Sequence, residues 1–270
     1  MKKNYEQIAK ATTIGLVAGL ADTAAVTVWL HRSQTHHSLK LRAPLEIIAR
    51  TIVWGTGTNP RAWAAVHRLH HENADTPKDP HSPVQEGRWG VLKLYFKNTP
   101  KYSRTATAIE EQGEYPADLQ PDKLDTAVFN HRKLGLLASL AGHVAINKKI
   151  GNPGYMGLFS WAIEKAFYVN GGNLVNAIGH SGRHPGKALI TGIIEPNEDG
   201  SYGADSAWVA GITMGEGNQR YHHDHPDSIY FGPNPESLDL VHRAARDLGG
   251  TIALGLIDCG LASVGEKQPS

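Results

Sequence analysis

Three groups of histidines constrain the fold of this chain more than any other feature of its sequence. Positions i, i+3 and i+4 of a helix fall within an arc of about 100°, because each residue turns the chain by about 100°. Two of the groups have this spacing, so each can aim several side chains at one small volume. Neutral imidazole is a good ligand for iron, copper, nickel or zinc, so the pattern indicates a multi-histidine metal site. The groups are His31-Arg32-Ser33-Gln34-Thr35-His36, His67-Arg68-Leu69-His70-His71 and Gln219-Arg220-Tyr221-His222-His223.

The first group fits a metal site only under one condition. His31 and His36 are five residues apart, which places them about 140° from each other on an ideal α-helix. They converge only where the helix ends or bends between them. The alternative is a basic cluster at a membrane interface.

Acidic residues and one further histidine extend the pattern. Asp75 and Asp79 follow the second group, and carboxylates orient metal-bound imidazoles through the other ring nitrogen. His180 lies near the end of an apolar segment, with Asn176 one turn earlier on the same face. A lone histidine there is more often a core residue, but the other groups favour a ligand.

Composition narrows the kind of metal and excludes several functions. The chain has 270 residues, one cysteine and a formal net charge of +1, and this length suits a single domain. Cys259 alone cannot form an internal disulfide or a cysteine-based zinc site, so nitrogen and oxygen must hold any metal. The near-neutral charge gives no basic field for nucleic acid. The sequence has no Walker, Rossmann or nucleophile-elbow motif, and it lacks the Glu-x-x-His pairs of soluble di-iron bundles.

One apolar segment, residues 11–30, is long enough to cross a hydrocarbon core of about 30 Å. Its only charge is Asp22, and basic residues flank it. A signal peptide is the alternative, but no small-residue cleavage site ends the segment. Residues 134–146, 155–178 and 248–264 are weaker candidates because they are short or carry charges. We therefore expect one span, two or three half-buried or interfacial helices, and association with a membrane.

Helical spacing dominates the rest of the chain, and no stretch alternates long enough to predict a sheet. An all-α fold is therefore expected, with residues 110–125 as an exposed connector. Predicted helices cover about residues 5–30, 44–54, 60–73, 89–98, 124–147, 157–181, 206–223 and 238–261.

The order of the motifs resembles the integral-membrane fatty acyl desaturases of the stearoyl-CoA (delta-9) type. Their pattern is H-R-x-x-x-H, H-R-x-H-H, N-x-x-x-H and G-E-G-x-H-x-x-H-H, which this chain matches at residues 31–36, 67–71, 176–180 and 215–223. The segments Thr35-His36-His37-Ser38-Leu39-Lys40 and Asp79-Pro80-His81-Ser82 also resemble family motifs. The resemblance covers about residues 11–262 of one desaturase-like domain, residues 1–270.

The resemblance implies an oxygen-dependent enzyme that introduces a double bond into a fatty acyl chain. It implies two irons on the cytoplasmic side of a helical membrane domain, dioxygen, and two electrons from an external donor such as ferredoxin or a cytochrome b5-like protein. It implies no catalytic residue beyond the metal site. Asn176 would hold a metal-bound water, and Trp63 would line the acyl site. The implied ligands are His31, His36, His67, His70, His71, His180, His222 and His223, with Gln219 in a further ligand position.

Three departures from the family pattern bear on these expectations. Gln219 replaces a histidine, as in front-end desaturases, which remain oxidases. Ala65 and Val66 replace an Arg-Asp pair that the family uses near the CoA head group, so a carrier-protein thioester or a lipid ester is an alternative substrate. The family's first transmembrane helix has no counterpart before residue 11.

Two other functions remain open. A hydroxylase on the same di-iron core begins with the same hydrogen abstraction, so the sequence does not separate it from a desaturase. A diverged, non-catalytic metal-binding membrane protein would explain Gln219 and the low mean hydropathy of −0.34.

Overall fold

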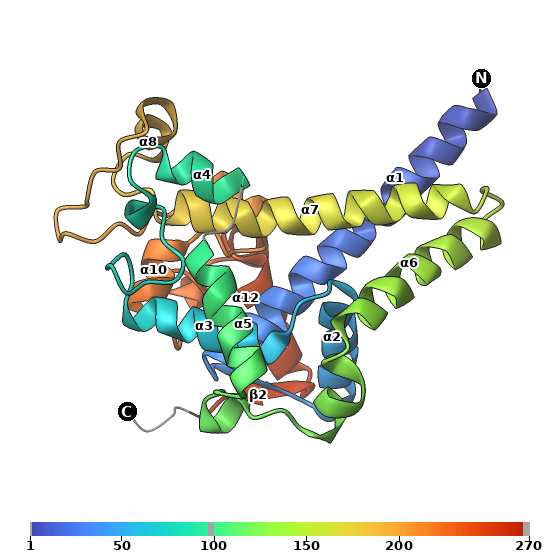
Figure 1. Cartoon of the computed structure of the whole chain (residues 1–270), viewed down its shortest axis with the longest axis horizontal. Coiled ribbons are helices and arrows are strands. Elements are labelled where there is room, and N and C mark those ends of the chain that lie inside the picture. The colour runs from blue at the N-terminus through green and yellow to red at the C-terminus, as the bar shows by residue number, and fades with distance from the viewer. Residues whose placement is uncertain (1, 97–99, 267–270) are drawn as a thin grey trace.

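The computed structural model describes residues 2–96 and 100–266, and these are mostly helical, as the all-α expectation requires. Three long helices form an arm that projects from the rest of the molecule (Figure 1). They are α1 (Lys2–Ala25), α6 (Arg132–Lys149) and α7 (Tyr155–Gly179). The shorter elements pack together at the other end of the arm, where the carboxyl ends of α1 and α7 lie.

Glycine allows α1 and α7 to pack closely in this arm. A Cβ atom at Gly15 would lie 2.4 Å from the carbonyl oxygen of Ser160, and one at Gly19 would lie 2.9 Å from the Phe167 ring. Small residues four apart on one helix face allow two backbones to approach, as in membrane helix pairs. The position of α7 against α1 therefore depends on these two glycines.

The helix that begins with α1 changes its winding before it ends. Residues Val26–Thr35 form a π-helical segment, η1, in place of the α-helix predicted as far as Leu30. Its i→i+5 bonds place residues five apart on the same face, and the amide of His36 donates to the carbonyl of His31 at 3.1 Å. The ring centroids of these two histidines are consequently 5.0 Å apart. The two histidines therefore converge through a change of helical winding and the end of the helix at Thr35, where the sequence requires an end or a bend.

The second histidine group is carried by α3 (Pro60–Glu72), which follows α2 (Ala43–Gly55). Both helices were predicted within two residues of their ends. Asn59 caps α3, because its side-chain oxygen accepts from the amides of Arg61 at 3.1 Å and Ala62 at 3.2 Å, and Pro60 occupies the first turn. Helix α4 (Gly90–Phe96) matches the prediction at its start, and its predicted end at Asn98 lies outside the described residues.

Three predicted helices are interrupted in the structure. Residues 124–147 divide into η4 (Asp125–Phe129) and α6, because the buried Asp125 is held by Arg50 at 2.6 Å and Arg61 at 2.9 Å. Residues 206–223 divide into α9 (Ala207–Ile212) and α10 (Gln219–Asp224), and residues 238–261 into α11 (Leu240–Arg246) and α12 (Leu248–Asp258). Two of these breaks lie at buried acidic residues that pair with distant arginines, Asp125 with Arg50 and Asp247 with Arg32, and local spacing does not reveal such pairs.

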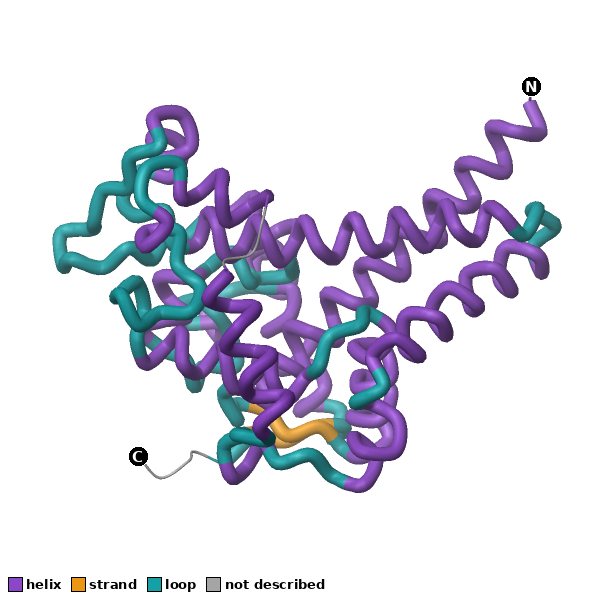
Figure 2. Tube along the Cα trace, viewed as in Figure 1, coloured by secondary structure: helices purple, strands orange, loops and turns teal. Residues whose placement is uncertain are grey.

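Several short elements were not predicted. Strands β1 (Leu39–Leu41) and β2 (Ala262–Val264) pair antiparallel, with Leu39 opposite Val264 (Figure 2). Three residues are too few to show an alternating pattern. Helix α5 (Pro100–Gln112) occupies part of the predicted connector, and α8 (Pro185–Thr191) follows α7. The remaining short helices are η2 (Val84–Glu86), η3 (Ala117–Leu119) and η5 (Pro235–Ser237).

The main apolar core surrounds η1 and α3. Trp29 and Leu30 are fully buried there, against Val53 of α2 and Val66 of α3. Burial of each such side chain contributes about 1.5–3 kcal/mol. This core fixes the two histidine-bearing helices against each other.

One helix among the described residues, Asn4–Thr35, is long and apolar enough to cross a membrane, and half of its 18-residue apolar window is buried within the protein. Large apolar side chains are exposed along the arm, including Val17, Leu137 and Leu158. The expectation of one span agrees with this count by length and composition.

Candidate metal centre

Two neighbouring clusters contain the eight histidines that the sequence singled out. Within each cluster, one ligand atom from every residue lies within 4.8 Å of the others. Cluster 1 draws on η1, α3 and α10, whereas cluster 2 draws on α3, α10 and the residue that ends α7. Cluster 1 consists of His31, His36, His67, His71 and His222, and cluster 2 of His70, His180 and His223.

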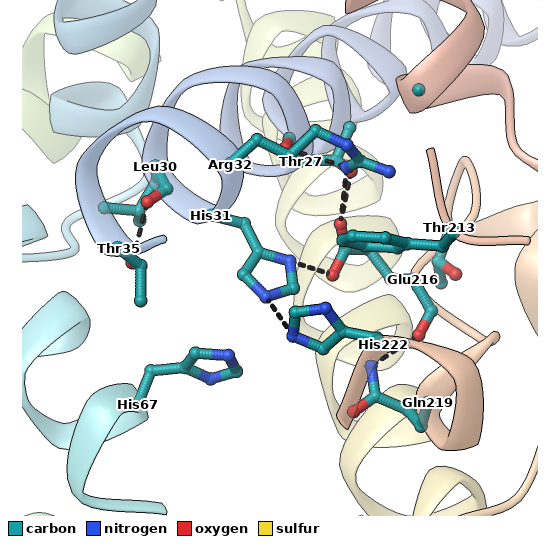
Figure 3. Close-up of polar contacts among 12 residues, drawn as sticks. Thr27, Leu30, His31, Arg32, Thr35, His67, Thr213, Glu216, Gln219 and His222 are labelled. Carbon is teal, nitrogen blue, oxygen red and sulfur yellow. Dashed lines mark hydrogen bonds and ion pairs between the residues drawn. The ribbon is translucent and has the colours of Figure 1, made fainter. Parts of the chain in front are cut away.

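In cluster 1 the imidazoles face one another through their Nε2 atoms. The Nε2 atom of His222 lies 3.0 Å from that of His31 and 3.0 Å from that of His71, which lies 3.0 Å from that of His67. Figure 3 shows the His31 ring between the Glu216 carboxylate and the His222 ring. The Nε2 atom of His36 is buried and has no hydrogen-bond partner among the described residues.

Cluster 2 has the same inward orientation. The Nε2 atom of His70 lies 3.1 Å from that of His180 and 3.3 Å from that of His223. The Nδ1 atom of His70 contacts Asp79 at 2.8 Å, and the Nδ1 atom of His180 contacts Asp75 at 3.1 Å. The two carboxylates that follow the second group therefore contact histidines of cluster 2 through Nδ1, in the position expected of groups that orient metal-bound imidazoles.

These contacts fit a bound cation. A carboxylate accepts hydrogen bonds, so His70 and His180 each carry a proton on Nδ1, and each ring in its neutral form directs the lone pair of Nε2 inward. Two Nε2 lone pairs then face each other at 3.1 Å in a buried space. A metal ion among the Nε2 atoms turns that repulsion into coordination, and an all-imidazole set suits iron, copper, nickel or zinc.

Burial keeps most of these rings neutral and able to bind a metal. Burial, reinforced by the neighbouring imidazoles, lowers the pKa of His67, His71, His222 and His223 well below the usual value. Metal binding requires neutral imidazole, so this shift favours occupancy near neutral pH. In His180, burial also lowers the pKa, but Asp75 outweighs it and the net shift is upward.

The carboxylate that orients His31 comes from an unexpected residue, Glu216. One of its oxygens lies 2.5 Å from Nδ1 of His31, and the other contacts Thr27 and Arg32. The sequence offered Gly-Glu-Gly only as part of the family resemblance, because nothing local pairs Glu216 with His31. Gly215 has φ = +106°, and a Cβ there would lie 1.9 Å from Asp247, so the loop that presents Glu216 requires glycine.

The arginines of the two H-R pairs hold the site together without facing it. Arg32 makes a two-pronged ion pair with the fully buried Asp247 at 2.8 and 3.0 Å, which ties η1 to α12. Arg68 donates to the carbonyl of Thr35 at 2.8 Å and pairs with Asp118 at 2.7 Å. Each arginine therefore joins one histidine-bearing helix to another part of the chain.

The structure also places the remaining predicted site residues. Gln219 lies beside the clusters: its amide nitrogen donates to the carbonyl of Glu216 at 2.7 Å, and its side chain is hydrogen-bonded to His180. Asn176 and Trp63 line the same cavity as His67 and His70. The Trp63 ring stacks on His67 with centroids 4.9 Å apart and an interplanar angle of 8°.

This cavity, of about 360 Å³, reaches the histidines from between α3, α5 and α7. Its size is within the range of small-ligand pockets. Glu110 and Arg132, which pair at 2.9 Å, lie at its more exposed end. Its wall is largely apolar and includes Val26, Ala62, Trp63, Val66, Ala106, Val169 and Val175.

His81 is a further residue of this wall. It is buried, and its ring contacts those of His70 and Tyr102. Burial lowers its pKa to about 3, so the ring is neutral. The sequence showed it only within the Asp79-Pro80-His81-Ser82 motif.

Comparison with known proteins gives a consistent result. A family model described as "Fatty acid desaturase" matches residues 9–249. The hex-5-enoyl-[acyl-carrier protein] acetylenase of Moorena producens is 28% identical over 241 residues, covering 84% of this chain and 71% of the relative. The chloroplastic palmitoyl-monogalactosyldiacylglycerol delta-7 desaturase of Arabidopsis thaliana is 28% identical over 267 residues, covering 98% of this chain and 65% of the relative.

A third relative, the acyl-CoA 5-desaturase AL21 of Anemone leveillei, is 27% identical over 212 residues, covering 78% of this chain and 59% of the relative. The match thus spans less than two thirds of the plant proteins. The printed names differ in acyl carrier and in bond position, but all three describe proteins that act on fatty acyl groups.

Proposed function

The chain belongs to the fatty acid desaturase family, and on that premise we propose that its histidine clusters hold two irons for the oxygen-dependent desaturation of a fatty acyl chain. The observation that carries the proposal is the meeting of all eight histidines in two clusters beside one apolar cavity. Residues 1–270 would act as a single desaturase-like domain.

Cluster 1 would hold one iron and cluster 2 the other, with Gln219 near cluster 2 and Asn176 acting through a water. Bound iron would supply the activation of dioxygen with two electrons from an external donor, such as ferredoxin or a cytochrome b5-like protein. The chain's own carboxylates hold a proton on Nδ1 of His31, His70 and His180, which keeps each Nε2 lone pair directed inward.

The apolar cavity would bind and orient the acyl chain beside the clusters. Trp63 is fixed against His67 by ring stacking, so it forms a rigid wall where the chain passes the metal centre. The apolar lining also excludes water from the reacting carbons.

The head group is the least constrained part of the substrate. Ala65 and Val66 are 3% and 1% exposed and pack in the core, so neither offers a charge to a CoA head. A carrier-protein thioester or a lipid ester is therefore favoured, in keeping with two relatives named for acyl-carrier protein and monogalactosyldiacylglycerol. The stearoyl-CoA delta-9 specificity stays a prediction.

The arm would lie in the membrane, with the metal centre on the cytoplasmic side. Large apolar side chains are exposed along it, whereas the charged groups in its interior are paired: Lys165 contacts Glu164 at 2.7 Å and Asp22 at 3.6 Å, and His143 contacts Glu164 at 2.6 Å. Ionisable groups within membrane segments normally face the protein interior in this manner.

The decisive experiment combines iron content with product mass. The chain is extracted gently from membranes, its iron per chain is counted, and it is supplied with acyl substrate, an electron donor and dioxygen. We expect about two irons and a product two hydrogens lighter than the substrate, and neither with His70→Ala. A product heavier by one oxygen would indicate the hydroxylase instead, and metal binding without an oxygen-dependent product would indicate the non-catalytic protein.

A further inference from the structure

A second cavity, of about 250 Å³, lies against cluster 2. The buried His180 and the half-buried His223 form one part of its wall, and the exposed Thr76, Ser201 and Arg220 form another. It therefore extends from the surface of the protein to two of the three cluster 2 histidines.

The two cavities meet the metal centre on different sides. The first is lined by His67 and His70 and the second by His180 and His223, and no residue lines both. The Nε2 atom of His70 lies 3.1 Å from that of His180 and 3.3 Å from that of His223. Cluster 2 thus separates the two cavities.

The outer wall of the second cavity carries the polar residues Ser201 and Arg220. Arg220 pairs with Asp199 at 3.0 Å, and the Ser201 hydroxyl donates to the same carboxylate at 2.7 Å. The amide of Arg220 donates to Asp205 at 3.0 Å, which fixes the start of α10 beside the cavity. Polar groups on this outer wall can hold water and hydrated solutes, and the apolar side chains that line the first cavity can contact an acyl chain.

The stoichiometry of the proposed reaction requires such a separation. Each desaturation oxidises two neighbouring CH₂ groups by one hydrogen each, reduces one dioxygen with two further electrons and two protons, and releases two waters. A bound acyl chain fills the first cavity while protons must arrive and water must leave. An apolar route occupied by substrate does not serve either purpose.

We propose that the second cavity is the aqueous entrance of cluster 2, through which water and small hydrophilic solutes reach His180 and His223 independently of the acyl cavity. The inference deepens the proposed function and rests on it for the roles of water and protons. Access of solutes to His180 and His223 through this cavity is a property of the folded chain, so it can be measured without a bound metal.

Two residues allow the cavities to be blocked one at a time. Ala74 lines only the second cavity and Ala106 only the first. Both side chains are half-buried methyl groups, so phenylalanine adds volume to a cavity without removing a hydrogen bond. Ala74→Ser is the matched control, because it changes the same position and leaves the space open.

The first measurement is the rate at which a charged, water-soluble iron(II) chelator removes iron from the full-length protein in detergent. Ala74→Phe should slow removal of the cluster 2 iron about tenfold, and Ala74→Ser and Ala106→Phe should stay within about twofold of the original chain. Slowing by Ala106→Phe alone would make the acyl cavity the entrance and overturn the inference. Equal rates in all four proteins would overturn it as well.

A second measurement does not depend on retained iron. Diethyl pyrocarbonate labels accessible imidazoles, and mass spectrometry of the metal-free chain reports each site separately. Ala74→Phe should slow the labelling of His223 and leave the labelling of His67 unchanged. Ala106→Phe should slow the labelling of His67 and leave that of His223 unchanged. If Ala74→Phe slowed the labelling of His67 instead, or of both histidines equally, the second cavity would not be the entrance. A chain that retains no iron would refute the proposed function, and this labelling would still decide the inference.

Discussion

At the scale of the residue, the carboxylates behind the clusters determine which imidazole nitrogen is available to a metal. Asp79 accepts from Nδ1 of His70, Asp75 from Nδ1 of His180, and Glu216 from Nδ1 of His31. The first two could be anticipated from the sequence, because they closely follow the second histidine group. Glu216 could not, because only the three-dimensional path of the loop at Gly215 brings it to His31.

Asp79→Asn tests this role. The amide no longer requires a proton on Nδ1 of His70, so the orienting effect is lost, and affinity for a cobalt(II) probe should fall about 10–100-fold. Asp239→Asn is the matched control, because Asp239 also contacts a histidine Nδ1, that of His242 at 2.7 Å, on the exposed surface. Titration of both metal-free proteins with cobalt(II), followed by absorbance, measures the difference; equal affinities would contradict the role of Asp79.

At the scale of the element, helices with a strong local pattern were predictable, whereas interruptions and short pieces were not. Helices α2 and α3 carry a proline in their first turn, and both were predicted closely. The sequence indicates only that the helix must end or bend between His31 and His36, and it does not predict the π-helical winding of η1. The breaks beside Asp125 and Asp247 depend on partners far along the chain, Arg50 and Arg32.

The packing of α1 on α7 leads to a prediction about Gly15. In Gly15→Ala the new methyl group meets the carbonyl oxygen of Ser160 at 2.4 Å, so we expect a loss of about 1–3 kcal/mol in the free energy of unfolding. Gly142→Ala is the control, because no atom lies within 4 Å of a Cβ there, and the better helix former should add up to about 1 kcal/mol. Denaturant unfolding in detergent compares them; equal stabilities would show that the helices do not pack this closely.

At the scale of the whole molecule, the clustered histidines connect stability to pH. Burial lowers the pKa of His67, His71, His222 and His223 in the folded chain, whereas the unfolded chain has the usual value of about 6.5. Between the two values the unfolded state binds more protons, so falling pH favours unfolding. The stabilisation is complete above the unfolded pKa and is lost as the pH falls through the folded values.

We therefore expect the melting temperature of the metal-free chain to fall steadily from pH 7.5 to pH 5.5. Replacing His71 and His223 by glutamine should make this slope shallower, because two of the groups that take up protons on unfolding are gone. Melting curves in detergent at matched ionic strength provide the test. A slope unaffected by the double replacement would assign the pH dependence to other groups.

The ion pair between Arg32 and Asp247, which lie far apart in the sequence, also determines when the site can form during translation. As the ribosome works from the amino terminus, η1 and α3 emerge early with five of the eight histidines, but α10 and the buried partner of Arg32 follow only near the end. The strand that pairs with β1 is made later still. The nascent chain must therefore remain without a finished histidine centre through most of translation, because both clusters are completed only when synthesis is almost finished.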